Sequence, residues 1–337
     1  MANEKLPLAF RFLIHHEWCN LLCKIKGVFM KIIYLGTPEF AVKPLKALIE
    51  AGHIIAGVVT QVDKVNSRGN KVVFSPVKQF CIDNNMRVYQ YNNLKRHGVE
   101  MLKSLKADIM ITASYGQILS KEIIDICKYG VLNIHGSLLP KYRGASPIQT
   151  ALINNEKVTG VTLMEMVKAM DAGRMYAKKE VLIDENDNST SLFDKIKEAA
   201  KELVLEALPK YINGELKGEE QDETLVSFCS TIKPEQEKLD LSLNANQIIG
   251  WIRGLSDEPC AYLYLNNLKL KIYKAKVVND IVDHEVGEIV KADKNGLYFQ
   301  AKDGQISILE LQKEGKKRMD YRSFINGNQG LLGQKLS

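Results

Sequence analysis

The chain has 337 residues, of which 45% are hydrophobic and 26% charged, and its net charge is +6. This composition leaves room for two folded domains and excludes both a disordered chain and the extreme basicity of histone-like proteins. Six scattered cysteines without a C-x-x-C pair argue against a zinc ribbon and indicate reduced thiols in the cytoplasm, and no stretch is apolar for long enough to span a bilayer.

Residues 1–29 contain short apolar pieces broken by histidines and charged residues, unlike the continuous apolar core of a signal peptide. Met30 then opens MKIIYLGTPEF, which is typical of a protein start. We therefore expect residues 1–29 to be a dispensable extension or the product of an upstream start codon, and not a targeting segment.

From residue 31 to residue 135 the sequence alternates between strand-like and helix-like stretches. We predict strands at 31–37, 53–60, 87–91, 107–114 and 130–135, with helices at 43–52, 76–86 and 120–130 between them. This alternation is typical of a Rossmann-like, doubly wound and mostly parallel sheet. Further strands are expected at 159–167 and 175–183, in an antiparallel arrangement. A long amphipathic helix at 189–214 has Ser191 and Asp194 as a variant capping box and ends at Gly214.

The character of the chain changes after the long helix. Residues 218–235 are polar and acidic, as in a linker. A helix at 244–255 then precedes short strands separated by Gly, Asn and Asp turns, which favours a small OB-like barrel. The predicted domains are a catalytic domain at 30–217, the linker at 218–235 and a C-terminal β-barrel at 236–337.

The stretch VLNIHGSLLPKYRG, residues 131–144, ends an apolar strand with two polar side chains. Asn133 and His135 are two residues apart and therefore lie on one face of the strand. The carboxyl end of a parallel strand is where ligand crevices form. There, an amide could stabilise an oxyanion and an imidazole could move a proton, as acyl transfer requires. Taken in isolation, the triplet is better explained by a strand end with a hydrogen-bonded structural histidine.

Asp171, in AMDAGRMY, is the candidate carboxylate for this histidine. Brought beside His135, it would orient the ring and favour its protonated form. The same Asp-x-Gly pattern also starts an ordinary turn. The loop LGTPEF after the first strand lacks G-x-G-x-x-G, which disfavours hydride-transfer chemistry with a dinucleotide.

NIHGSLLPKYRGASPIQ, followed by TGVTLMEMVKAMDAGRM, resembles the 10-formyltetrahydrofolate-dependent formyltransferase family. The resemblance extends over about residues 30–330. Three segments are similar to the members of the family that act on initiator tRNA: the basic loop at 60–78, the stretch LDLSLNANQIIGWIRGL, and GKKRMDYRSFINGNQGLLG near the end of the chain.

The resemblance implies an enzyme that transfers the formyl group of 10-formyltetrahydrofolate to the α-amino group of methionine on initiator Met-tRNA, for translation initiation. The implied catalytic residues are Asn133, His135 and Asp171, and no metal is involved. The implied folate-contacting loop consists of Ser137, Leu138, Leu139 and Pro140, and Arg68 is the implied tRNA contact. We expect a cytoplasmic monomer with no membrane partner.

Two positions depart from the family pattern. Arg174 stands where an acidic residue is common, and SDEPCAY at 256–262 replaces a turn that often contains Pro-Trp-Pro. Basic residues also cluster in the C-terminal domain, where they form either a phosphate-binding surface or a solvated face; they are Lys269, Lys271, Lys274, Lys276, Lys316, Lys317 and Arg318.

Three other functions remain open at this stage. A formyltransferase that acts on a glycinamide nucleotide should lack the C-terminal domain. A formyltransferase that acts on an amino sugar can have a similar one. A catalytically inactive RNA-binding protein of the same fold should have lost one of Asn133, His135 and Asp171, and this chain retains all three.

Overall fold

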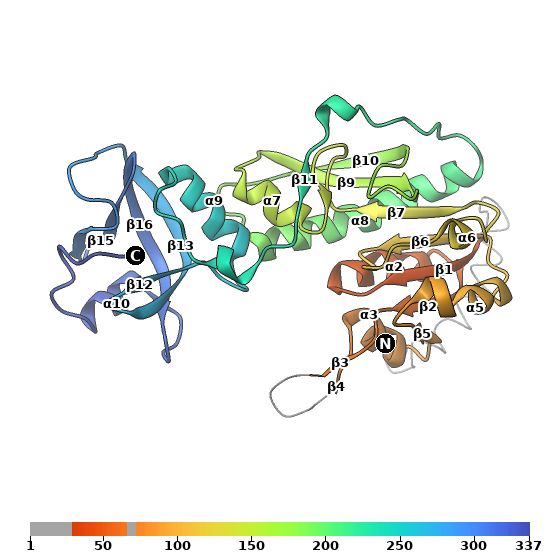
Figure 1. Cartoon of the computed structure of the whole chain (residues 1–337), viewed down its shortest axis with the longest axis horizontal. Helices are drawn as coiled ribbons and strands as arrows, with labels where there is room; N and C mark the ends of the chain where they lie inside the picture. Colours follow the sequence, from red (N-terminus) through yellow and green to blue (C-terminus); the bar gives the residue numbers. More distant parts are fainter. Residues whose placement is uncertain (1–28, 66–71) are drawn as a thin grey trace, which may run out of the picture. The chain divides into compact units, whose positions relative to one another are not determined.

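The computed structural model describes residues 29–65 and 72–337 (Figure 1). The chain divides into two compact units. The first contains the residues up to Arg143 together with Gly160–Val181 and Lys195–Ser227, and the second contains Gly144–Thr159, Leu182–Asp194 and Phe228–Ser337. In the part of the chain that the structure describes, no helix combines the length and the apolarity that a membrane crossing requires.

A seven-stranded sheet forms the centre of the first unit, in the order β10-β9-β7-β6-β1-β2-β5. The strands are β1 (Lys31–Gly36), β2 (Ile54–Thr60), β5 (Val88–Gln90), β6 (Ile109–Ala113), β7 (Val131–His135), β9 (Val158–Glu165) and β10 (Met175–Leu182). Neighbours among β5, β2, β1, β6 and β7 pair in parallel, whereas β9 runs antiparallel to β7. The predicted doubly wound, mostly parallel sheet is confirmed.

Helices lie between or after these strands along the chain. They are α2 (Val42–Glu50), which follows the short helix η1 (Glu39–Ala41), then α3 (Pro76–Asp83), α4 (Leu94–His97), α5 (Val99–Ser104), α6 (Lys121–Ile124) and α8 (Ser189–Ile212). Ile33 and Leu35 of β1 belong to a core cluster that includes Leu94 and Leu102, which lie on α4 and α5. The residues between them, Ile32 and Tyr34, are equally buried, so β1 is covered on both faces, as parallel strands generally are.

Two predicted helix features differ from the structure. The helix predicted at 120–130 is only the four-residue α6, because turns and a left-handed Gly130 (φ +68°) lead the chain into β7. The capping box of α8 is formed by Asn188 and Ser191, not by Ser191 and Asp194. The Ser191 N–H donates to Asn188 Oδ1 (3.0 Å) and the Asn188 N–H donates to Ser191 Oγ (3.1 Å).

The second unit contains a six-stranded antiparallel sheet in the order β12-β13-β16-β15-β14, with β17 paired to β16. Its strands are β12 (Tyr262–Leu265), β13 (Leu268–Asn279), β14 (Ile289–Asp293), β15 (Gly296–Ala301), β16 (Gly304–Lys313) and β17 (Met319–Asp320). Its helices are α7 (Pro147–Ile153), α9 (Ala245–Leu255) and α10 (Tyr321–Asn326). The predicted C-terminal β domain is confirmed.

The last residues of the chain connect the two edge strands of this sheet. Leu336 bridges to Leu265 of β12, and Lys335 bridges to Glu288, just before β14. The Leu336 N–H donates to the carbonyl of Gly287 (2.8 Å). Gly287 has a φ of +87°, and a side chain there would collide with the Leu336 carbonyl. The tail therefore closes the sheet into a barrel and removes its open edges.

The stretch predicted as a linker, residues 218–235, makes local structure. It contains the short helices η2 (Glu223–Leu225) and η3 (Pro234–Glu237) and the strand β11 (Phe228–Cys229), which pairs with β8 (Arg143–Gly144). The domain boundaries themselves stay a prediction.

Leu336→Ala tests the closure of the barrel. Leu336 is buried in the barrel core, so the substitution should lower the free energy of unfolding by about 2–5 kcal/mol. Leu332→Ala is the matched control, because Leu332 is 66% exposed and should cost less than about 0.5 kcal/mol. Urea denaturation measures both. Equal, small losses would show that the tail does not close the barrel.

Candidate active site

The carboxyl ends of β6 and β7 bring three polar side chains together. Thr112 of β6 lies directly opposite Asn133 of β7 in the register of the two parallel strands, and His135 follows two residues later. All three are buried, with exposed fractions of 3%, 8% and 6%. Because β1 lies between β2 and β6, the winding of the sheet reverses beside these strand ends, which is where α/β folds bind ligands.

Thr112 fixes the amide of Asn133. The Thr112 hydroxyl donates a hydrogen bond to Asn133 Oδ1 at 2.7 Å. This contact leaves the Nδ2 group as the free end of the amide, and within residues 29–65 and 72–337 it has no hydrogen-bond partner. A donor with a fixed direction can serve a developing negative charge. The sequence does not predict Thr112 as a site residue, although a polar residue near the end of the apolar strand IMITA is the available signal.

The imidazole of His135 lies between two acceptors. Its Nε2 atom is 2.9 Å from the carbonyl oxygen of Tyr142, and its Nδ1 atom is 3.7 Å from Oδ2 of Asp171. A ring protonated on both nitrogens would therefore have an acceptor on each side. Asn133, His135 and Asp171, which the sequence placed in one site, lie in the same region of the first unit.

Thr162 makes two hydrogen bonds to the loop after His135. Thr162 of β9 donates from its hydroxyl to the carbonyl of Ser137 (2.7 Å) and accepts from the N–H of Leu139 (3.1 Å). Leu139 is buried against Met164 and Met175, whereas Leu138 and Pro140 are partly exposed. Of the four residues predicted to contact folate, Ser137 and Leu139 thus face inward and the other two are accessible.

The first departure from the family pattern, Arg174, has a structural partner. Its guanidinium makes two hydrogen bonds to Glu165, at 2.9 and 3.0 Å. Burial opposes ionisation of Glu165, but the hydrogen bonds and charge of Arg174 outweigh burial and lower the pKa of that carboxyl. Arg174 therefore fastens the β9–β10 turn to Glu165.

The basic loop at 60–78 is only partly described. Arg68, the predicted tRNA contact, lies outside the described residues, as does Lys71. The flanking segments form the short hairpin of β3 (Lys64–Val65) and β4 (Val72–Val73). Lys78 is paired with Asp63 (2.5 Å) and also donates to Gln90 (2.8 Å). It is consequently not an unpaired cation for a phosphate.

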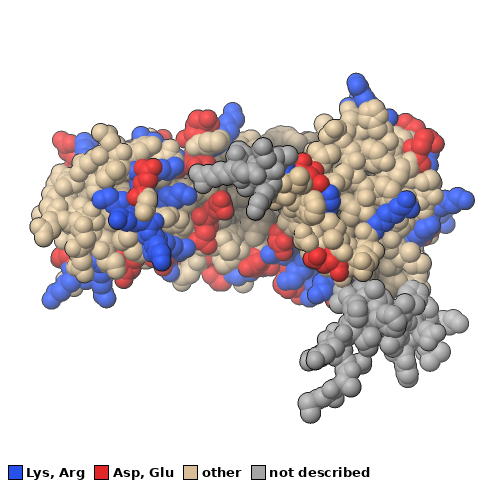
Figure 2. Space-filling view, turned by 90° about the horizontal axis from the view of Figure 1, so that it is seen from below, with Lys and Arg blue, Asp and Glu red and all other residues tan. Residues whose placement is uncertain are grey.

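The basic residues of the barrel divide into paired and unpaired ones. Figure 2 shows lysine and arginine side chains gathered over the part of the surface that belongs to the barrel, at the left. Lys274, Lys276 and Lys317 are exposed, and within the described residues their side chains have no ion-pair or hydrogen-bond partner. The Lys269 ammonium lies 3.6 Å from the ring centroid of Tyr262.

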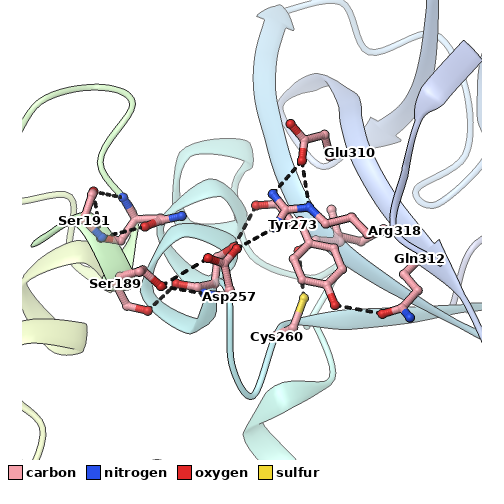
Figure 3. A network of polar contacts seen from close by, with 12 residues as sticks. Ser189, Ser191, Asp257, Cys260, Tyr273, Glu310, Gln312 and Arg318 are labelled. Carbon is pink, nitrogen blue, oxygen red and sulfur yellow. Dashed lines mark hydrogen bonds and ion pairs between the residues drawn. The ribbon is translucent and has the colours of Figure 1, made fainter. Parts of the chain in front are cut away.

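Arg318 differs from these lysines. Its guanidinium donates to Asp257 and to Glu310, both at 2.8 Å, and lies 4.3 Å from the ring centroid of Tyr273 (Figure 3). Partial burial opposes its charge, but the two carboxylates outweigh burial and raise its pKa. The SDEPCAY turn, the second departure from the family pattern, supplies Asp257. Arg318 therefore joins this turn to the barrel and is already neutralised.

Fold and side chains together define an α/β enzyme site with an amide donor and an imidazole at the end of β7 and a carboxylate beside the imidazole. Two family profiles match the chain, "Formyl transferase" over residues 30–208 and "Formyl transferase, C-terminal domain" over residues 231–329. The chain belongs to the formyl transferase family, as its sequence predicts.

Similar curated proteins share most of the chain. The methionyl-tRNA formyltransferase of Fusobacterium nucleatum is 38% identical over 310 residues, which are 91% of this chain and 100% of that relative. The methionyl-tRNA formyltransferase of Dictyoglomus thermophilum is 40% identical over 311 residues, 91% of this chain and 99% of that relative.

Solved structures share the fold. An N-formyltransferase from Helicobacter canadensis, in complex with folinic acid and dTDP-3-aminofucose, has a TM-score of 0.64 and 21% identity, covering 85% of this chain and 100% of its own. HypX from Aquifex aeolicus, in complex with tetrahydrofolic acid, has a TM-score of 0.59 and 17% identity. The match covers 88% of this chain and 47% of the HypX chain.

Thr112→Val tests whether the threonine orients the amide. Valine is close to threonine in volume but lacks the hydroxyl that holds Asn133 Oδ1. We therefore expect kcat for formyl transfer to fall about tenfold or more. Thr112→Ser keeps the hydroxyl and should stay near the wild-type rate. Steady-state kinetics of both variants, with melting curves as a check on folding, provide the measurement. Equal rates for Val and Ser at position 112 would remove the hydroxyl from the mechanism.

Proposed function

We propose that this chain transfers the formyl group of 10-formyltetrahydrofolate to the α-amino group of methionine on initiator Met-tRNA. The observation that carries this proposal is the set of Asn133 and His135 on β7 with Asp171, from the turn between β9 and β10, beside the imidazole, in a chain that matches both formyl transferase domains. Relatives named methionyl-tRNA formyltransferase, which match 91% of the chain, support the choice of acceptor.

In the proposed reaction the unprotonated amine of methionine attacks the formyl carbon, which is bound to N10 of the folate. The carbonyl oxygen then becomes negatively charged. Asn133 Nδ2 donates a hydrogen bond to this oxygen, and the doubly protonated His135 stabilises its charge. Each ring nitrogen has an acceptor beside it, Tyr142 O at Nε2 and Asp171 Oδ2 at Nδ1.

Collapse of the tetrahedral intermediate breaks the bond between the formyl carbon and N10. The amine loses one proton and N10 gains one, so the reaction needs no redox partner. Asp171 orients His135 and assists removal of the amine proton, directly or through a water. The products are formyl-methionyl-tRNA and tetrahydrofolate.

The folate co-substrate is proposed to bind along the loop of residues 137–140. The partly exposed Leu138 and Pro140 offer apolar surface to the flat pterin ring, and Thr162 keeps the loop in place. The similar structures of HypX and of the Helicobacter canadensis N-formyltransferase are complexes with tetrahydrofolic acid and folinic acid, respectively. For this chain they support a ligand of the same chemical class.

The tRNA is proposed to contact Arg68 in the first unit and unpaired lysines in the barrel. Lys274, Lys276 and Lys317 are the barrel candidates, because Arg318 is neutralised by two carboxylates. Exposed lysines bind the phosphate backbone without reading its sequence. We further propose that the protein is a cytoplasmic monomer, with residues 1–29 dispensable.

An amino sugar is the alternative acceptor that the fold favours, because the similar Helicobacter canadensis structure contains dTDP-3-aminofucose. Incubation with 10-formyltetrahydrofolate and either charged initiator tRNA or dTDP-3-aminofucose separates the two. The proposal expects formyl-methionine on the tRNA and no formylated sugar. Formylation of the sugar alone would replace the proposed function.

His135→Ala should lower kcat for formyl transfer roughly 10²–10⁴-fold, because the positively charged ring is lost from the site. Asn133→Ala should lower it roughly 10²–10³-fold, because the oxyanion loses a donor, while folate affinity changes little. His97→Ala and Asn92→Ala make the same substitutions at exposed positions of the first unit and should retain full turnover. Near-normal turnover in either active-site variant would exclude that residue from catalysis.

Arg68→Ala should raise the KM for Met-tRNA and leave the dissociation constant of the folate unchanged. Loss of one phosphate contact should also reduce the slope of log affinity against log salt concentration by about one unit. Binding assays at several salt concentrations measure this, with exposed Arg96→Ala as the control for a simple loss of charge. If both variants have the wild-type salt slope, tRNA recognition belongs to the barrel.

A further inference from the structure

Two residues that face the His135 imidazole have unusual backbone conformations. Tyr142 has a φ of +61° and Asp171 a φ of +48°, both in the left-handed region. Tyr142 supplies the carbonyl next to Nε2, and Asp171 supplies the carboxylate next to Nδ1. Residues other than glycine rarely adopt this backbone conformation, and it persists only where neighbouring contacts hold it. The positions of both acceptors therefore depend on those contacts.

On the Asp171 side, two of the contacts come from Gln221, which is buried. Its Nε2 group donates to the carbonyl of Asp171 and to the carbonyl of Gly173, both at 2.8 Å. Gly173 permits this close turn, since a Cβ atom there would lie 2.0 Å from the carbonyl oxygen of Glu165. One side-chain amide thus holds two carbonyls of the turn that carries the carboxylate.

The contacts on the Tyr142 side come from Ser227, six residues further along the same segment. The Ser227 hydroxyl accepts from the N–H of Tyr142 (3.0 Å), and the Ser227 carbonyl accepts from the N–H of Arg143 (2.8 Å). Residues 221–227, which we call the strap, therefore hold both of the loops that flank the imidazole.

Arg143 fixes the direction of the Gln221 amide. Its Nε group donates to Gln221 Oε1 at 3.0 Å, and its guanidinium pairs with Glu223 at 2.8 Å. Since Oε1 accepts from arginine, the two donors of Nε2 are left for the carbonyls of Asp171 and Gly173. Arg143 is itself only 4% exposed, so the arrangement is built into the interior of the first unit.

We propose that Gln221 is a positioning residue for the reaction: it holds the turn of Asp171 so that the carboxylate faces Nδ1 of His135. The inference rests on the proposed function, because it concerns the same site. Loss of the Gln221 donors would free the turn to relax from its left-handed conformation and would move the carboxylate away from the imidazole. Binding of the two substrates would be little affected.

Gln221→Met is the main test, because methionine has a similar length and no donor. We expect kcat for formylation of Met-tRNA to fall at least tenfold, with the KM values for tRNA and folate within about threefold of wild type. In an Asp171→Asn background the same substitution should change kcat less than twofold, since the carboxylate that Gln221 positions is already absent. Gln79→Met, at an exposed glutamine of α3, is the control and should leave kcat unchanged.

Glu223→Ala provides a second variant in case Gln221→Met fails to fold. Glu223 is exposed and supports the network only through Arg143, so a smaller fall in kcat, about two- to fivefold, is expected without a change in KM. Two results would overturn the positioning role of Gln221. One is a wild-type kcat in every strap variant that folds, and the other is a Gln221→Met effect on kcat that is as large in the Asp171→Asn background as in the wild type.

The ring signals of His135 in NMR spectra give a readout that needs no substrate. They are assigned by their absence in His135→Asn, and we expect them to shift in the Gln221→Met and Glu223→Ala variants but not in Gln79→Met. Unshifted signals in both strap variants would overturn the inference. If the wild type shows no formyl transfer while the strap variants still shift the His135 signals, the proposed function is overturned and the positioning role of Gln221 remains supported.

Discussion

The parallel pairing of β6 with β7 is the constraint on which the site depends. It sets Thr112 opposite Asn133, so the threonine hydroxyl determines which end of the amide is free. It also places His135 at the end of the strand, where the chain turns and Tyr142 returns its carbonyl to the ring. A shift of one residue between these strands would turn Asn133 and His135 to the other face of the sheet. The packing of the core and the geometry of the site consequently depend on the same strand register.

Around this pair, the fold supplies support from segments that are distant in sequence. Thr162 on the antiparallel strand β9 holds the loop after His135, and the strap at 221–227 holds the two left-handed residues that face the imidazole. Backbone strain at such positions is tolerated only where the surroundings determine it several times over. The second unit has a different task in this account, since its exposed lysines offer charge to a phosphate backbone rather than chemistry.

Much of the fold and the three central residues could be predicted from the sequence. Alternating β-branched strands and amphipathic helices indicate a parallel sheet, and a spacing of two residues puts Asn133 and His135 on one face. Thr112 and Gln221 could not be predicted, because their roles come from strand register and from tertiary contacts across the chain. The availability of a charged side chain is equally hard to predict from the sequence, as Arg318 shows. Next to two lysines in sequence it looks available to RNA, but Asp257 and Glu310 neutralise it in the fold.

The most direct test of the account is the single-turnover rate of formyl transfer in the complex of enzyme, 10-formyltetrahydrofolate and charged initiator tRNA, compared between the wild type and Asp171→Asn. The proposed mechanism predicts that the wild type forms formyl-methionine in a stoichiometric first turnover. It also predicts that Asp171→Asn binds both substrates with unchanged affinity and reacts about 10² times more slowly or worse. Equal rates in the two proteins, or a wild type that forms no formyl-methionine, would contradict it.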